Sequence, residues 1–127
     1  MTFARRLYLI AGIYGLIVLV PQYFLEQRIG QDTPPPITHP EFFYGFVGTA
    51  VVFQAVFLIL ARDPLRYRSM MIPSVLEKAA FGIPVLLLFL QGRTSAMTLA
   101  FGTIDLILGA LFVAAYVRTG RVASSPS

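Results

Sequence analysis

The chain contains no cysteine and only one histidine in 127 residues, and charged residues make up only 13% of it. The lack of cysteine excludes disulfide bonds, thiol catalysis, thiolate metal sites and most iron–sulfur chemistry. A structural zinc site would then depend almost entirely on carboxylates, which is not a zinc preference. We therefore expect neither a metal nor a cofactor.

The low charge also separates this chain from soluble proteins, in which about a quarter of the residues are charged. Hydrophobic residues make up 57% of the chain and its mean hydropathy is +0.75, which indicates a protein dissolved in a lipid bilayer. The net charge of +4 comes from basic residues in short clusters between apolar runs. That pattern is typical of membrane topology, so we expect the lipid bilayer as a partner and no nucleic acid.

Four apolar runs each come close to the roughly 20 residues that cross a bilayer as a helix. A helix satisfies its own backbone hydrogen bonds in lipid, and short connections place consecutive helices side by side. The sequence therefore predicts an all-α fold, a transmembrane up-down four-helix bundle, forming one integral membrane domain over residues 1–127. The expected helices cover about residues 7–25, 42–61, 70–90 and 96–117, and a disordered tail is expected over residues 122–127.

Arginines outside these helices are divided unequally between the two sides of the predicted bundle. The side with both chain ends holds seven of them, and the other side holds only Arg28 and Arg93. Because loops rich in Lys and Arg stay in the cytoplasm, we expect cytoplasmic N and C termini and a multi-pass protein of the cell inner membrane. The seven are Arg5, Arg6, Arg62, Arg66, Arg68, Arg118 and Arg121.

Each predicted helix carries polar or ionisable residues near its middle. At about 1.5 Å per residue, all of them lie within about 6 Å of the bilayer midplane. A polar depth shared by four helices indicates packing around a common interior site. These candidate residues for a ligand site or a polar core are Tyr14, Gln54, Glu77, Lys78 and Asp105.

Lys78 is expected to pair with Asp105, because the small residues Gly102 and Gly109 on the same helix face as Asp105 let a neighbouring helix approach. Alternatively, Lys78 extends along its helix toward the cytoplasmic interface. Glu77 and Lys78 are adjacent in sequence and point about 100° apart, so we do not expect them to face each other.

One lysine neutralises one carboxylate, so Glu77 must be hydrogen-bonded, in contact with water in a cavity, or protonated. Its candidate partners are Gln54, Tyr14 and the Ala80 carbonyl, whose helical hydrogen bond is removed by Pro84. Pro21 in the first helix likewise removes the helical hydrogen bond of the Ile17 carbonyl. Kinks in two helices can open a small interior cavity, which is where a ligand would bind.

Ionisable residues inside a membrane are in general a functional-site hypothesis, since each costs about 3 kcal/mol on insertion scales. A buried ion pair can equally serve only to fix helix register. Both roles stay open for Glu77 and Asp105. Lys78 fits a structural role, and Gln54 and Tyr14 fit ordinary hydrogen bonding between helices.

The turn "RDPLRYR" after the second helix and the segment "VLEK" in the third, with four short helices and both ends inside, resemble the DoxX-like small bacterial membrane proteins. Some members of that group are linked to redox complexes or quinone-dependent sulfur oxidation, and no catalytic residue can be transferred from it. The segments "VPQYFLE" and "VVFQAVF" are also similar to the emopamil-binding and sigma-2-receptor-like fold. That similarity implies binding of sterols and amphiphilic amines, although the acidic residue before "VFQ" in that fold is Ala50 here.

Three functions follow from these patterns. The first is a binding or accessory protein for a lipid- or quinone-like amphiphilic molecule or for a membrane partner. The second is a membrane enzyme or proton-coupled carrier that uses Glu77 and Asp105 as exchangeable carboxyl groups. The third is a structural subunit that assembles through glycine-rich helix faces into a homo-oligomer or a membrane complex.

Overall fold

The computed structural model describes residues 2–123, and most of those residues are helical, with no strand among them, as the sequence predicts. Four helical stretches are long and apolar enough to cross a membrane, namely Thr2–Phe24, Pro40–Arg62, Arg68–Leu90 and Ala96–Ala123. This is the make-up of a multi-pass membrane protein. In chain order the elements are α1 (Thr2–Leu19), the 3₁₀ helix η1 (Val20–Phe24), α2 (Glu26–Asp32), α3 (Pro40–Arg62), the 3₁₀ helix η2 (Arg68–Met70), α4 (Met71–Leu90) and α5 (Ala96–Ala123).

The first helix differs from its predicted range of residues 7–25 at both ends. It begins at Thr2, and its α-helical part ends at Leu19, where the chain tightens into η1. Pro21 explains this change, because proline has no N–H to donate to the carbonyl four residues earlier. The second predicted helix, about residues 42–61, corresponds to α3, which begins two residues earlier at Pro40, because proline suits the first position of a helix.

The last helix is longer than the predicted range of residues 96–117 and reaches Ala123. The predicted disordered tail is therefore wrong for residues 122 and 123, and its remainder, residues 124–127, lies outside the described residues. The added turns are polar and are held by contacts: Thr119 donates to the Ala115 carbonyl, and the Arg68 guanidinium packs against Gly120. Apolar length alone therefore underestimates this helix.

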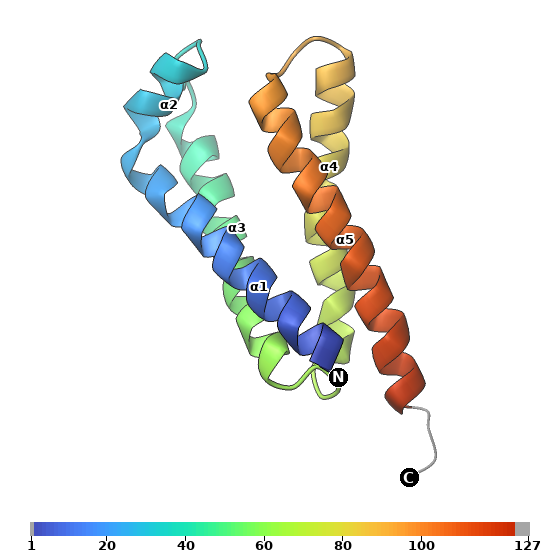
Figure 1. The fold of residues 1–127 in the computed structure, drawn as a ribbon. Helices are drawn as coiled ribbons and strands as arrows, with labels where there is room; N and C mark the ends of the chain where they lie inside the picture. The colour runs from blue at the N-terminus through green and yellow to red at the C-terminus, as the bar shows by residue number, and fades with distance from the viewer. Residues whose placement is uncertain (1, 124–127) are drawn as a thin grey trace.

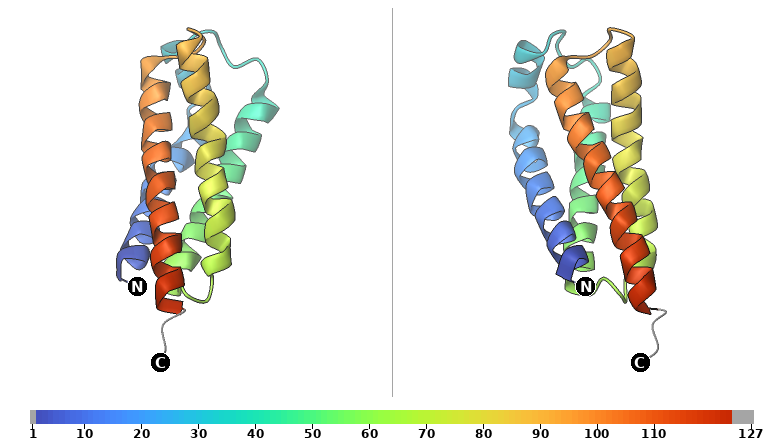
Figure 2. Two further views of the ribbon diagram at one scale, coloured as in Figure 1. Left: turned by 90° about the vertical axis from the view of Figure 1, so that its right-hand side faces the viewer. Right: turned by 45° about the vertical axis from the view of Figure 1, so that its right-hand side comes forward.

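The helices form two pairs, in which α1 packs chiefly against α3 and α4 against α5 (Figure 1). We call the end at which α1 begins and α5 ends the base, and the opposite half, which contains α2, the distal half. The two pairs lie close together at the base and are farther apart in the distal half (Figure 1), and the turned views show the start of α1 and the end of α5 at the same end of the molecule (Figure 2). Close approach within the pairs depends on small residues: a Cβ on Gly15 would collide with Gln54, and one on Gly102 would lie 2.7 Å from Val85.

The base contains the packed core of the molecule. Tyr8 stacks on Phe112 with ring centroids 4.3 Å apart, and Phe57 contacts both rings. These three side chains are fully buried and come from α1, α5 and α3, so the core joins the two helix pairs. The other buried members of the cluster are Ala4, Leu7, Ala11, Leu60, Met71 and Ala115.

Candidate ligand-binding cavity

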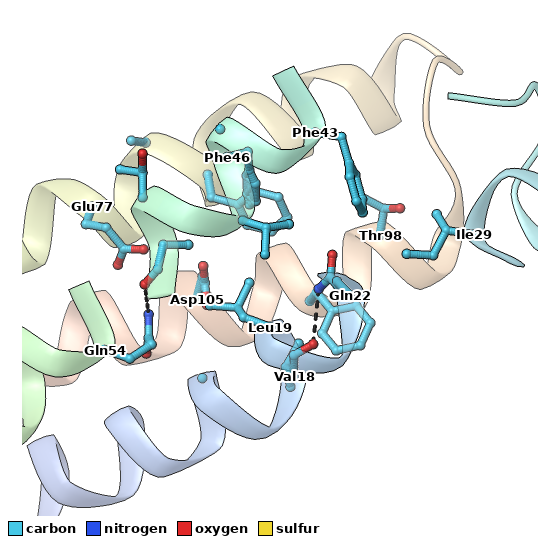
Figure 3. Close-up of a pocket in the computed structure, with 18 of the residues that line it drawn as sticks. Val18, Leu19, Gln22, Ile29, Phe43, Phe46, Gln54, Glu77, Thr98 and Asp105 are labelled. Atoms are coloured by element: carbon cyan, nitrogen blue, oxygen red, sulfur yellow. Dashed lines mark hydrogen bonds between the residues drawn. The ribbon is translucent and has the colours of Figure 1, made fainter. Parts of the chain in front are cut away.

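A cavity of about 1090 Å³ occupies the distal half, between the two helix pairs. Its walls come from α1, η1, α2, α3, α4 and α5, so every long helix contributes to it. Most of the lining is apolar, and five phenylalanines belong to it: Phe42, Phe43, Phe46, Phe81 and Phe101. The close-up in Figure 3 shows Glu77, Gln54 and Asp105 gathered at one end, with Phe43, Thr98 and Ile29 toward the other. The cavity is therefore amphipathic along its length.

All five polar residues that the sequence singles out line this one cavity: Tyr14, Gln54, Glu77, Lys78 and Asp105. Because the packed core begins with Phe57 and Tyr8 at the base, the polar residues lie where the core ends and the cavity begins. Polar residues at a shared depth in the four predicted helices are thus neighbours in space.

Lys78 is held between two carboxylates. Its Nζ atom lies 3.3 Å from Asp105 Oδ1 and 3.6 Å from Glu77 Oε2. The pairing with Asp105 is as predicted, but the expectation that Glu77 and Lys78 do not face each other is wrong. The 100° offset describes the Cβ directions, and the four-carbon lysine stem is long enough to bring the ammonium back to its neighbour.

The alternative in which Lys78 extends toward the membrane interface is also wrong, because the residue is only 3% exposed. Close packing of α4 on α5 accounts for this burial. A Cβ on Gly109 would lie 3.2 Å from the Lys78 Cβ, so the glycine leaves the space through which the lysine stem passes. The ammonium also lies 5.2 Å from the centroid of the Phe57 ring, on the core side.

Gln54 does not bond to another helix, contrary to the role that its position suggested. Its Nε2 donates to the Ala50 carbonyl of its own helix at 2.7 Å (Figure 3). That bond fixes the orientation of the amide, so Oε1 is the free acceptor, and Oε1 is buried without a hydrogen-bond partner. Glu77 Oε2 likewise has no hydrogen-bond partner, and neither Gln54 nor Tyr14 bonds to Glu77 among residues 2–123.

The charged cluster contains two carboxylates and one ammonium. If all three groups are ionised, the cluster carries a net charge of −1. Lys78 is the only basic residue in the cavity lining, and Glu77 and Asp105 are the only acidic ones. The cluster can therefore accept a cation, hold a proton, or bind a neutral group that donates hydrogen bonds.

Sequence reasoning missed the distal wall of the cavity. Residues 26–41 contain the short helix α2, from which Ile29 reaches the cavity, followed by Thr33. Gly30 lets the chain fold back, since a Cβ there would lie 3.1 Å from Pro36. The only signal in the sequence is the single apolar residue within the polar segment "EQRIGQD". Gln22 was also missed; it lines the cavity and donates its Nε2 to the Val18 carbonyl at 3.1 Å (Figure 3).

The chain matches no protein family, no curated protein and no solved structure with which it was compared. Within residues 2–123 no group of three or more His, Asp or Glu side chains is placed to hold a metal ion. The residues of the cavity are therefore the basis on which function is inferred.

Proposed function

We propose that this chain is a multi-pass inner-membrane protein that binds one amphiphilic, lipid- or quinone-like molecule in the distal cavity. The observation that carries the proposal is the cavity itself, with apolar walls along its length and a charged cluster at one end. The tail of the ligand lies among Phe43, Phe46 and Phe101, and its head group lies beside Glu77 and Asp105. The volume of about 1090 Å³ is slightly above the roughly 300–1,000 Å³ typical of small-molecule sites.

The proposed topology is an up-down bundle with both termini in the cytoplasm. The arginine distribution supports it, because Arg5, Arg66 and Arg118 belong to segments at the base, where α1 begins and α5 ends (Figure 1). In that orientation the distal half lies in the outer half of the bilayer. A ligand then enters from the lipid, between the two helix pairs, without crossing the packed core.

A second candidate function is a proton-coupled carrier or membrane enzyme that uses Glu77 and Asp105. The observation that favours it is Glu77 Oε2, a buried carboxylate oxygen without a hydrogen-bond partner, beside a lysine that it shares with Asp105. Two carboxylates that share one cation exchange a proton at low cost in charge. Both candidates place the chemistry at the same end of the same cavity.

Native mass spectrometry of the protein, purified in mild detergent, tests the proposal. We expect a retained small-molecule adduct whose occupancy falls in Glu77→Gln and Asp105→Asn, and its mass identifies the ligand class. No adduct in any preparation, with weakened subunit contacts or lower stability in the variants, would assign the cluster to architecture. An adduct retained together with proton transport in vesicles, lost in both variants, would favour the carrier.

Gly45 offers a cavity-blocking variant that leaves the charged cluster intact. It lines the cavity, and a Cβ placed on it meets no atom within 4 Å. Gly45→Phe should therefore reduce adduct occupancy by filling part of the space. Gly45→Ala is the matched control, since it makes the same backbone change and leaves the space open. Equal occupancy in the two variants would contradict binding in this cavity.

A further inference from the structure

The two sides of the charged cluster are not equally accessible. The Lys78 side chain is 4% exposed, whereas those of Glu77 and Asp105 are 15% and 16% exposed. The ammonium lies on the core side, near the Phe57 ring, and its hydrogen bond goes to Asp105. The polar end therefore exposes more of its two carboxylates than of Lys78, the charged donor in the lining, whose side chain is almost fully buried.

The glutamines in the cavity each use one donor within their own helix. Gln54 and Gln22 donate Nε2 to the carbonyl four residues earlier. Each keeps Oε1 as an acceptor and the second N–H of Nε2 as a donor, and in Gln54 the Oε1 atom is buried without a partner in a residue only 1% exposed. The strongest hydrogen-bonding groups of the lining are the carboxylates of Glu77 and Asp105, which only accept when ionised, and the hydroxyls of Tyr14 and Thr49 can serve either way.

The aromatic rings of the lining also favour positively charged or hydrogen-bond-donating groups. Five phenylalanines line the cavity, and the face of a phenylalanine ring carries partial negative charge. A carbonyl head group would bring acceptor atoms toward acceptors and ring faces. A hydroxyl or an ammonium would instead donate to Glu77 or Asp105, and an ammonium would also balance the net charge of −1.

We infer that the cavity selects amphiphiles whose head group donates hydrogen bonds, a hydroxyl or an ammonium, over those whose head group only accepts them, such as a ketone or an oxidised quinone. This inference rests on the proposed function and narrows its ligand class. For a quinone-like ligand, it means that the dihydroxy form binds more tightly than the dione.

A series of dodecyl amphiphiles that differ only in the head group tests the inference. Dodecylamine, 1-dodecanol, 2-dodecanone and dodecyltrimethylammonium are titrated into the protein in lipid nanodiscs, and occupancy is read by native mass spectrometry per mole fraction in the bilayer. We expect the amine, the alcohol or both to bind about tenfold or more tightly than the ketone, the range for hydrogen bonds to charged acceptors. The trimethylammonium compound is a cation without an N–H. It therefore shows whether positive charge is sufficient for tight binding or whether the head group must also donate a hydrogen bond.

The outcomes are distinct. A preference for the alcohol alone supports a hydroxylated ligand, and a preference for the amine alone supports an ammonium ligand. A ketone that binds as tightly as both donors overturns the inference while leaving the proposed function in place. A trimethylammonium compound that binds as tightly as the amine, with the alcohol no better than the ketone, overturns it in favour of charge alone. Binding of no member of the series refutes the proposed function itself.

Two variants test whether the carboxylates cause the preference for hydrogen-bond donors. Each amphiphile partitions into the bilayer equally for every variant, so comparing variants removes differences in partitioning between the amphiphiles. Glu77→Gln and Asp105→Asn each place an amide with N–H donors at the cavity end, so the donor-over-ketone ratio should fall about tenfold in at least one of them. Glu41→Gln is the matched control, an exposed residue on α3 outside the cavity lining, and it should leave the ratio unchanged. An unchanged donor-over-ketone ratio in both cavity variants would overturn selection by the carboxylates. If either variant fails to fold, the amphiphile series on the wild-type protein decides whether the cavity prefers donors.

Discussion

Lys78 serves two carboxylates, whereas Asp105 is one of two counter-ions, so removing them should affect stability unequally. Lys78→Met keeps much of the volume of the stem but leaves Glu77 and Asp105 without a cation. Breaking a buried ion pair from one side costs about 3–5 kcal/mol. Because the carboxylates are 15% and 16% exposed to a cavity, we expect the lower end of that range, about 3 kcal/mol.

Asp105→Asn is the milder change. Asparagine keeps a side-chain oxygen that can accept from Lys78 Nζ, and Glu77 remains as a counter-ion 3.6 Å away. The variant removes only the negative charge from one hydrogen bond, so the free energy of unfolding should fall by about 1–2 kcal/mol. The double variant Lys78→Met with Asp105→Leu should recover part of the loss of the single Lys78 variant, because one of the unpaired carboxylates is gone.

The assay is equilibrium unfolding in mixed micelles with increasing SDS mole fraction, followed by far-UV circular dichroism. Asp32→Asn is the control: Asp32 pairs with Arg28 at 3.2 Å on the exposed surface of α2, so its loss should change the free energy of unfolding very little. If Asp105→Asn destabilised the protein as much as Lys78→Met, the shared-lysine arrangement would be refuted.

Three further changes test the packing. Tyr8→Phe should raise the free energy of unfolding by up to about 1 kcal/mol, because the buried Tyr8 hydroxyl has no hydrogen-bond partner; a loss in SDS unfolding would contradict this. Arg68→Lys should cost about 1 kcal/mol, since lysine loses the stacking over the Tyr116 ring at 3.7 Å and the Nε bond to the Tyr116 carbonyl, and an unchanged melting temperature would argue against it. Gly102→Leu should cost about 1–3 kcal/mol by collision with Val85, measured beside Thr103→Leu on the exposed face of α5 as control.

Helix number and approximate position could be predicted because lipid imposes a simple constraint on length and polarity. The ends were less predictable where side-chain chemistry intervenes. Pro21 converts the end of the first helix into η1, and contacts of Thr119 and Gly120 carry α5 past its apolar stretch. The short helix α2 has too few apolar residues to show a periodicity.

The sequence was sufficient to predict which polar residues belong to the candidate site, but not all of the contacts between them. Depth in the bilayer and the small residue Gly109 were enough to pair Lys78 with Asp105. Helical geometry alone misplaced Glu77 relative to Lys78, because it ignores the reach of long side chains. Phenylalanines that line the cavity look in sequence like lipid-facing or core residues, so the cavity walls could not be inferred. The resemblance to DoxX-like proteins stays a prediction.

The central claim is that the distal cavity holds an amphiphile with its head group at the carboxylates. A crystal structure of the protein grown from a lipidic mesophase tests it most directly. Binding in this cavity predicts elongated non-protein density between Phe46 and Phe101, with a polar end within hydrogen-bond distance of Glu77 or Asp105. A collapsed cavity, in which the two helix pairs close and the phenylalanine rings meet with no ligand between them, would contradict it.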